Sequence, residues 1–239
     1  MLARLRMHHR FGLTVYLAVI SVFCVSLSLF RAAYTGTQGF LFLNWNLVLA
    51  CIPWLLTSFM ILRELKGTFS VLLVMAVWLL FFPNSLYIIT DLIHLGSIKG
   101  APVWLDLILI LAFAWTGLCF GFSSLMDIEG KLSTRFKLSR RQVTVLSVGM
   151  LFLAAFGIYL GRFLRWNSWD LLGYPRALLD DVFDPFTDPA NNLRFWGFTL
   201  AMGTLLNLMY FGVRMLVRNR ISEPAASAGD PGPTGRSPL

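Results

Sequence analysis

Charged residues are scarce in this sequence. Asp, Glu, Lys and Arg together make up 13% of 239 residues, while hydrophobic residues make up 57%. An ordinary soluble domain carries about twice that share of charge, which it needs to cover its surface. The composition therefore excludes a typical water-soluble globule and indicates lipid as the main surroundings of the chain.

Cysteine and histidine are also rare. The three cysteines are odd in number and each lies inside an apolar stretch, so neither a disulfide framework nor a metal cluster is indicated. They are Cys24, Cys51 and Cys119. Beyond the first ten residues His94 is the one histidine, so a metal would need a carboxylate-rich set such as Asp91, Asp106 and His94. We expect no metal, and nothing in the sequence identifies another cofactor.

Several catalytic and binding motifs are missing. No serine stands in a nucleophile elbow, no His-Glu-x-x-His occurs, and no glycine-rich phosphate loop follows a strand. No repeat of fixed period stands out. The net charge of +8 comes from short basic clusters beside apolar blocks, where membrane topology explains them, so we expect no nucleic-acid partner.

Long apolar blocks are what the sequence does contain. Each is about long enough, at 1.5 Å per residue, for one helix to cross a hydrocarbon core of about 30 Å. The blocks are residues 11–30, 45–62, 68–89, 103–125, 143–164 and 195–217. They predict an all-α membrane protein with six transmembrane helices in residues 11–220. A basic leader, residues 1–10, precedes them, and residues 221–239 are expected to be a disordered tail.

Six crossings place both ends on one side of the membrane. The flanks on that side hold 14 of the 20 Lys and Arg residues, and the opposite flanks hold six. The strongest cluster, five basic residues within 131–141, belongs to the richer side. Because positive residues are retained in the cytoplasm, the N-terminus and C-terminus are predicted to be cytoplasmic.

A polar stripe marks the outer end of the third block, in the stretch FFPNSLYIITDLIHL. If this stretch is helical, Asn84, Tyr87, Asp91 and His94 fall within one arc of roughly 80°. A carboxylate and an imidazole aligned near membrane depth are costly without a purpose, which favours a functional site. The alternative is that these side chains join helices by hydrogen bonds or are solvated at the interface. Pro83 makes a bend below the stripe plausible.

A second polar cluster marks the outer end of the fifth block. Gly157 and Gly161 form a small-xxx-small pair that allows a neighbouring helix to approach closely. Arg162 and Arg165 suit an anionic headgroup, although snorkelling is an alternative for the arginines. Trp166 is explained equally well by an aromatic belt at the membrane boundary.

Two further outer features are open to more than one interpretation. Asp106, one turn into the fourth block, would be an expensive lone charge, and Arg162, Arg165 or His94 are its candidate partners. The segment from Asp170 to Arg194 predicts a short amphipathic helix, either a lid lying on the membrane or an ordinary solvated face.

These motifs carry a family resemblance. The run PN-x-x-Y-x-x-TD-x-x-HL begins at Pro83, and GRFLRWNSWD follows at Gly161 to Asp170. Both resemble bacterial membrane proteins of domain of unknown function family 1361, over roughly Asn44 to Val217. The resemblance implies a multi-helix protein of the bacterial inner membrane and supplies no catalytic roles.

Three functions remain open from the sequence. The first is a membrane-embedded enzyme or lipid-headgroup binder, with Asp91 and His94 as acid–base candidates. Its other candidate site residues bind or orient a substrate such as an anionic headgroup, and they are Asn84, Tyr87, Asp106, Arg162, Arg165, Trp166 and Asp170. The second is a small solute, proton or cation carrier, although the inner halves of the third and fifth blocks are nearly all apolar. The third is a non-catalytic assembly partner. The oligomeric state is not indicated.

Overall fold

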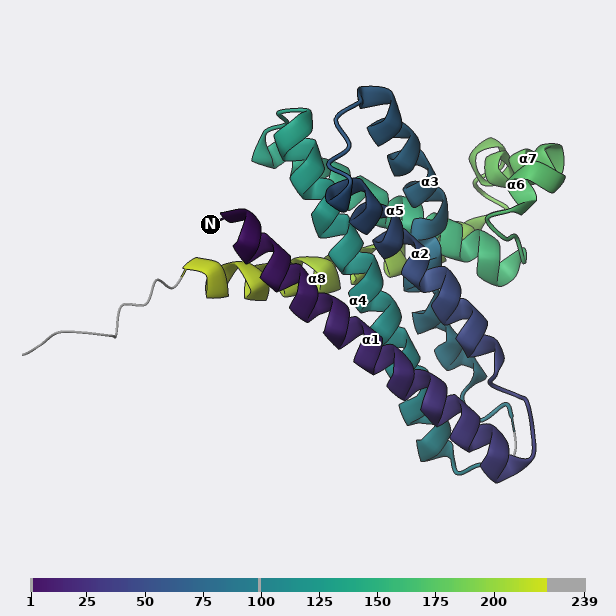
Figure 1. The fold of residues 1–239 in the computed structure, drawn as a ribbon. Helices are drawn as coiled ribbons and strands as arrows, with labels where there is room; N and C mark the ends of the chain where they lie inside the picture. The colour runs from purple at the N-terminus through teal and green to yellow at the C-terminus, as the bar shows by residue number, and fades with distance from the viewer. Residues whose placement is uncertain (1, 99, 223–239) are drawn as a thin grey trace, which may run out of the picture.

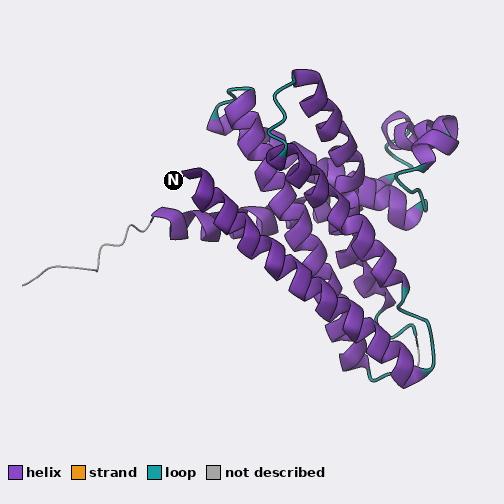
Figure 2. Ribbon diagram, in the orientation of Figure 1, coloured by secondary structure: helices purple, strands orange, loops and turns teal. Residues whose placement is uncertain are grey.

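The chain forms a bundle of long helices in a computed structural model (Figure 1). The structure describes the backbone of residues 2–98 and 100–222, and the side chains of residues 10–98 and 100–217. The elements are α1 (Leu2–Thr35), α2 (Phe42–Leu62), α3 (Thr68–Tyr87), the 3-10 helix η1 (Ile88–His94), α4 (Val103–Arg135), α5 (Arg140–Phe163), α6 (Asp170–Gly173), α7 (Pro175–Thr187) and α8 (Leu193–Ser222). Across the described ranges only helices and loops occur (Figure 2).

Six of these helical stretches are long and apolar enough to cross a membrane. They coincide with the six apolar blocks, so the prediction of an all-α protein with six membrane-spanning helices is confirmed. The N-terminal end of α1 and the far end of α8 lie on the same side of the bundle, as an even number of crossings requires (Figure 1).

The helices extend beyond the apolar blocks at several ends. The predicted leader is continuous with the first span, because α1 already begins at Leu2. At the start of α5 the Ser139 side chain accepts a hydrogen bond from the Gln142 backbone N–H, and the Gln142 side chain bonds back to Ser139 in a capping box. The predicted tail lies outside the described residues from position 223 onward.

Helix α4 is the centre of the bundle. In its most apolar window 56% of the residues are buried, against 17% for both α1 and α8. It contacts α1, α2, α3, η1 and α5, whereas α8 packs mainly against α5. The remaining helices therefore expose much of their apolar surface to lipid.

Glycines set the closest helix contacts. A Cβ atom on Gly117 of α4 would lie 2.5 Å from the Ser85 carbonyl oxygen of α3, a distance that no side chain tolerates. Likewise, a Cβ on Gly157 of α5 would lie 2.7 Å from the Pro83 ring of α3. Small residues allow this close backbone approach between membrane helices, as the small-xxx-small pair in α5 predicted. Helix α3 is thereby fixed between α4 and α5.

Two ion pairs fasten α1 to α4 at opposite ends. Arg10 contacts Asp127 at 3.0 Å, and Arg31 contacts Asp106 at 2.8 Å. The two arginines are 21 positions apart in α1, and so are the two aspartates in the antiparallel α4. At about 1.5 Å per residue the pairs are about 32 Å apart, close to the thickness of the hydrocarbon core.

The segment after α5 forms two short helices, α6 and α7, rather than the single predicted one. They lie beside the bundle at the end of α5 (Figure 1). The Asp181 carboxylate of α7 accepts a 2.7 Å hydrogen bond from the Trp166 indole, and the Pro185 carbonyl accepts one from Trp196 of α8. The exposed apolar side chains of this segment include Leu172 and Phe183.

Candidate functional site

Asp91 is fully buried at the end of the third span that lies away from the chain termini. It lies in η1, where the 3-10 helix continues the direction of α3 beyond Tyr87. Arg162, near the end of α5, forms an ion pair with one carboxylate oxygen, and the side-chain amide of Asn46 in α2 donates to the other at 3.0 Å. Three spans therefore meet at one carboxylate.

Arg162 organises the surroundings of this carboxylate. Its guanidinium donates to the Thr90 hydroxyl from Nε at 2.9 Å and from an Nη atom at 2.7 Å, and it lies 4.2 Å from the centre of the Tyr87 ring. A further Nη atom is 3.2 Å from Nε2 of His94. Because a guanidinium can only donate, Nε2 of His94 is the acceptor and its Nδ1 carries the proton.

Three of the four side chains of the predicted polar stripe share one partner, Arg162, and Asn84 does not. Tyr87, Asp91 and His94 all contact Arg162, so the structure brings together the two clusters that the sequence placed on the same side. Asn84 instead donates to the hydroxyl of Ser168 at 2.9 Å, in the loop after α5. The helix runs through Pro83 without interruption and changes from α to 3-10 only after Tyr87.

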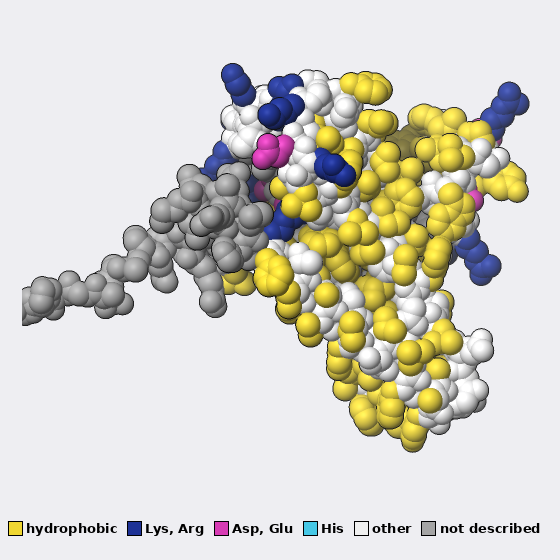
Figure 3. All heavy atoms as spheres, in the orientation of Figure 1, with side chains coloured by type: hydrophobic (Ala, Val, Ile, Leu, Met, Phe, Trp, Pro, Cys, Tyr) yellow, Lys and Arg dark blue, Asp and Glu magenta, His cyan; other side chains and the backbone are white. Residues whose placement is uncertain are grey.

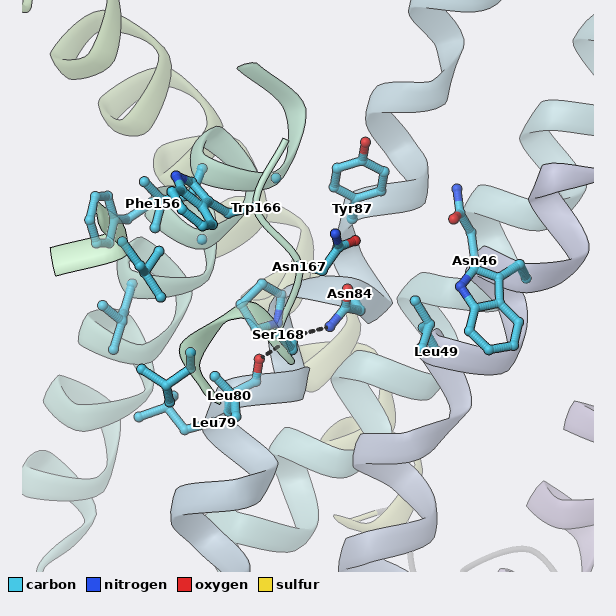
Figure 4. A pocket seen from close by; sticks show the side chains of 18 residues that line it. Asn46, Leu49, Leu79, Leu80, Asn84, Tyr87, Phe156, Trp166, Asn167 and Ser168 are labelled. Carbon is cyan, nitrogen blue, oxygen red and sulfur yellow. Dashed lines mark hydrogen bonds between the residues drawn. The ribbon is translucent and has the colours of Figure 1, made fainter. Parts of the chain in front are cut away.

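A pocket of about 280 Å³ lies beside this charged group, between α2, α3, α5 and the loop that follows α5 (Figure 4). Its polar lining consists of uncharged groups, and all eighteen lining residues are free of formal charge. The polar side chains are those of Asn46, Asn84, Tyr87, Asn167 and Ser168, together with the indoles of Trp45 and Trp166. Asn46 also contacts Asp91, and Tyr87 contacts Arg162. The ion pair therefore lies directly behind the part of the pocket wall that Asn46 and Tyr87 form.

The pocket is lined by hydrogen-bonding and apolar side chains together. Leu79 and Leu80 lie below Asn84 and Tyr87 in Figure 4, one turn or more along α3, and Ser168 lies beside Leu80, to whose carbonyl it donates. Leu153 of α5 extends the same apolar wall. Leu171 of α6 and Leu178 of α7 add lining from the segment beside the bundle. The lining therefore combines hydrogen-bonding groups with an extended apolar wall.

Asp106 does not belong to this site. The prediction that Asp106 pairs with Arg162, Arg165 or His94 is wrong. Asp106 pairs instead with Arg31 of α1, and both side chains are only 1% exposed. The Arg31 guanidinium also lies 4.6 Å from the centre of the Phe40 ring. The physical reason is depth: Arg31 lies in the last turns of α1, opposite the first turn of the antiparallel α4.

Three other predicted site residues lie at the edge of the pocket or outside it. Arg165 is exposed, with φ at +62°, and within the described residues it forms no ion pair. Trp166 lines the pocket and is held by Asp181. Asp170 accepts from the backbone N–H and side chain of Asn167, so it shapes the loop that carries Asn167 and Ser168.

Sequence reasoning missed Arg31, Asn46, Thr90 and Ser168. Arg31 and Asp106 are lone charges at the same ends of their spans, and matching them by depth would have indicated the pair. Thr90 and Ser168 stand inside the two motifs already singled out. Asn46 carries no signal of its own, because one amide near the start of an apolar block is common.

The carboxylate-rich set that a metal would need does not converge. Asp91 and His94 contact Arg162, whereas Asp106 is enclosed with Arg31. Within the described part of the chain no group of three or more His, Cys, Asp or Glu residues is placed to hold a metal ion.

The comparisons with known proteins agree with the motifs. The family described as "Protein of unknown function (DUF1361)" matches residues 45–209, which include α2 to α7 and most of α8. No curated protein and no solved structure matches the chain. The match covers more than half of the chain, and the chain therefore belongs to this family of proteins of unknown function.

Proposed function

We propose that the protein binds an amphiphilic molecule of the bilayer, with an apolar tail and an uncharged, hydrogen-bonding head, in the pocket between α2, α3 and α5. The observation that carries the proposal is the lining of the pocket. Five amide or hydroxyl side chains line it together with leucines and other apolar side chains. Ligand sites typically combine a mainly apolar wall with a few such orienting groups.

The state of the charged residues favours binding over acid–base chemistry. Asp91 is fully buried and paired with Arg162, and it does not line the pocket. Arg162 is likewise engaged by Asp91, Thr90 and His94, so its charge is not free for an anionic headgroup. The ion pair fixes the positions of Asn46 and Tyr87, which do reach the pocket.

The size of the pocket suits part of a lipid molecule. A volume of about 280 Å³ is at the small end of ligand pockets, enough for a headgroup and the first carbons of a tail. Apolar side chains such as Leu80 and Leu153 are 38% and 46% exposed at its rim, so a tail can continue into the surrounding bilayer.

Two paired substitutions test this proposal. Asn84→Leu removes a polar lining group, and Trp45→Ala removes a large apolar side chain from the pocket wall. Each is expected to lower the affinity for the proposed amphiphile about 5- to 10-fold. The controls are Asn207→Leu in α8 and Trp104→Ala. Trp104 is 61% exposed and Trp45 57%, but only Trp45 lines the pocket. Native mass spectrometry of the purified variants measures the bound molecule. Equal loss in the controls and the pocket variants would reject the site.

We also propose that both termini face the cytoplasm of a bacterial cell, in its inner membrane. The excess of Lys and Arg on the flanks of the terminal side supports this orientation. Of the six basic residues on the other flanks, Arg31 and Arg162 are engaged in ion pairs within the bundle, which sharpens the asymmetry. In a cysteine-free background, an impermeant maleimide should label Gly173→Cys in intact cells and leave Ser139→Cys unlabelled. The reverse pattern would overturn the orientation.

A further inference from the structure

The connection between α4 and α5 carries a concentrated positive charge at the end of the bundle opposite the pocket. Lys137, Arg140 and Arg141 are exposed there, and within the described residues none of the three pairs with a carboxylate. Dark blue side chains gather over this end of the molecule in Figure 3. Their charge is therefore available to an external anion.

An open, mainly apolar surface lies directly beside these charges. It follows one face of the first turns of α5 and consists of Leu138, Arg141, Gln142, Val145 and Leu146. Val145 is 63% exposed and Leu146 41%, so none of the described helices covers this face.

Gln142 adds a donor at the boundary between the charged and the apolar parts. Its side-chain oxygen is engaged by the capping box, where it accepts from the backbone N–H and the hydroxyl of Ser139, both at 2.9 Å. In the described part of the chain no acceptor occupies its NH2 group. This NH2 group is therefore available to donate a hydrogen bond to an external ligand next to Arg141.

We infer that an anionic phospholipid of the adjacent leaflet binds here, with its phosphate at Arg141 and Gln142 and its acyl chains along Val145 and Leu146. Clusters of basic residues next to a membrane helix attract acidic lipids, and each contributes appreciably to binding. The continuous apolar face below the charges distinguishes a phospholipid from nucleic acid or an acidic protein, which would leave that face unfilled. The site is independent of the amphiphile pocket and of the orientation of the chain.

The test compares two double variants by native mass spectrometry of the full-length protein titrated with dioleoyl phosphatidylglycerol or phosphatidylcholine. R140Q/R141Q should bind phosphatidylglycerol about 30-fold more weakly than the wild type. R165Q/R176Q, which removes two exposed arginines from the other end, should change this affinity less than about twofold. Val145→Ser keeps every charge and should weaken the long-chain lipid severalfold while leaving dihexanoyl phosphatidylglycerol unaffected.

An excess of inorganic phosphate should not displace the lipid, because it lacks the acyl chains. Three results would overturn the inference: equal affinity of the wild type for the two lipids, equal losses in the two double variants, or displacement by inorganic phosphate. Retained amphiphile binding in R140Q/R141Q is the expected sign that the two sites are separate.

Discussion

Two arginine–aspartate pairs lie at the end of the bundle away from the termini, and their surroundings differ. Arg31 and Asp106 are each 1% exposed and are closed off by Thr37 and the Phe40 ring. Arg162 remains 11% exposed while Asp91 is fully buried, and a pocket adjoins the pair. The same ion-pair chemistry thus fastens helices in one place and supports the wall of a cavity in the other.

The comparison shows why a buried charge in a membrane helix is not sufficient evidence for a functional site. Asp106 and Asp91 are equally unusual in the sequence, yet only Asp91 has neighbours that reach a cavity. The Arg31 pair, with Arg10 and Asp127 at the other end, holds α1 along the whole length of α4. The following changes break or sharpen this contrast, from the largest expected effect to the smallest.

Arg31→Met should cause the largest loss of stability. It leaves Asp106 buried without a partner, a change that costs about 3–5 kcal/mol in the free energy of unfolding. The double variant Arg31→Met/Asp106→Leu should recover most of this loss, because it removes both charges. Thermal unfolding of the purified protein measures both variants. A single variant as stable as the wild type would show that this pair does not fasten α1.

Arg162→Met should be less damaging, at about 2 kcal/mol. Asn46 still donates to Asp91, and the partial exposure of Arg162 allows water to reach the carboxylate. Unlike the Arg31 variant, this one should also lose the bound amphiphile in native mass spectrometry, because Tyr87 and Asn46 lose their fixed positions. Full retention of the ligand would separate the pocket from the ion pair.

Gly157→Ala tests the contact that brings α3 against α5. The new Cβ would lie 2.7 Å from the stiff Pro83 ring, so we expect a loss of about 1–2 kcal/mol and a disturbed pocket. Gly149→Ala in the same helix is the matched control, because nothing lies within 4 Å of its Cβ. The control should be neutral or slightly stabilising. Similar unfolding midpoints for the two variants would contradict the close approach.

His94 should show the smallest effect. His94→Leu removes one acceptor of Arg162 and should cost about 1 kcal/mol, while His94→Gln can still accept and should stay within about 0.5 kcal/mol of the wild type. Chemical unfolding in mixed micelles resolves this difference. A large loss in both variants would give His94 a role beyond its hydrogen bond to Arg162.

The sequence was sufficient for the fold because lipid imposes strong patterns on it. Apolar blocks of the right length located all six spans, and Gly157 with Gly161 indicated close packing of α5. It did not locate the end of α4, since Asp127 and Glu129 interrupt the apolar block while the helix continues to Arg135. Paired charges are tolerated inside a membrane bundle, so the end of an apolar block is not the end of the helix.

The candidate site was only partly accessible from the sequence. The predicted stripe grouped Tyr87, Asp91 and His94, and all three contact Arg162, although the change from α to 3-10 geometry after Tyr87 turns Asp91 and His94 away from the arc that a continuous α-helix predicts. Partners from other spans depend on how the helices are arranged, which no single-chain pattern encodes. For that reason the sequence does not indicate Asn46, and it offers Arg162, Arg165 or His94 as the partner of Asp106 rather than Arg31.

The most direct measurement places a photoreactive amino acid at Leu171 or at its neighbour Leu172. Leu171 lines the pocket, whereas Leu172 is 88% exposed and lies outside the lining. After irradiation in native membranes, the cross-linked molecule at Leu171 should be one amphiphile, strongly enriched over its share of the membrane lipids. Adducts at Leu172 should follow the bulk lipid composition. The same composition at both positions would contradict a selective pocket.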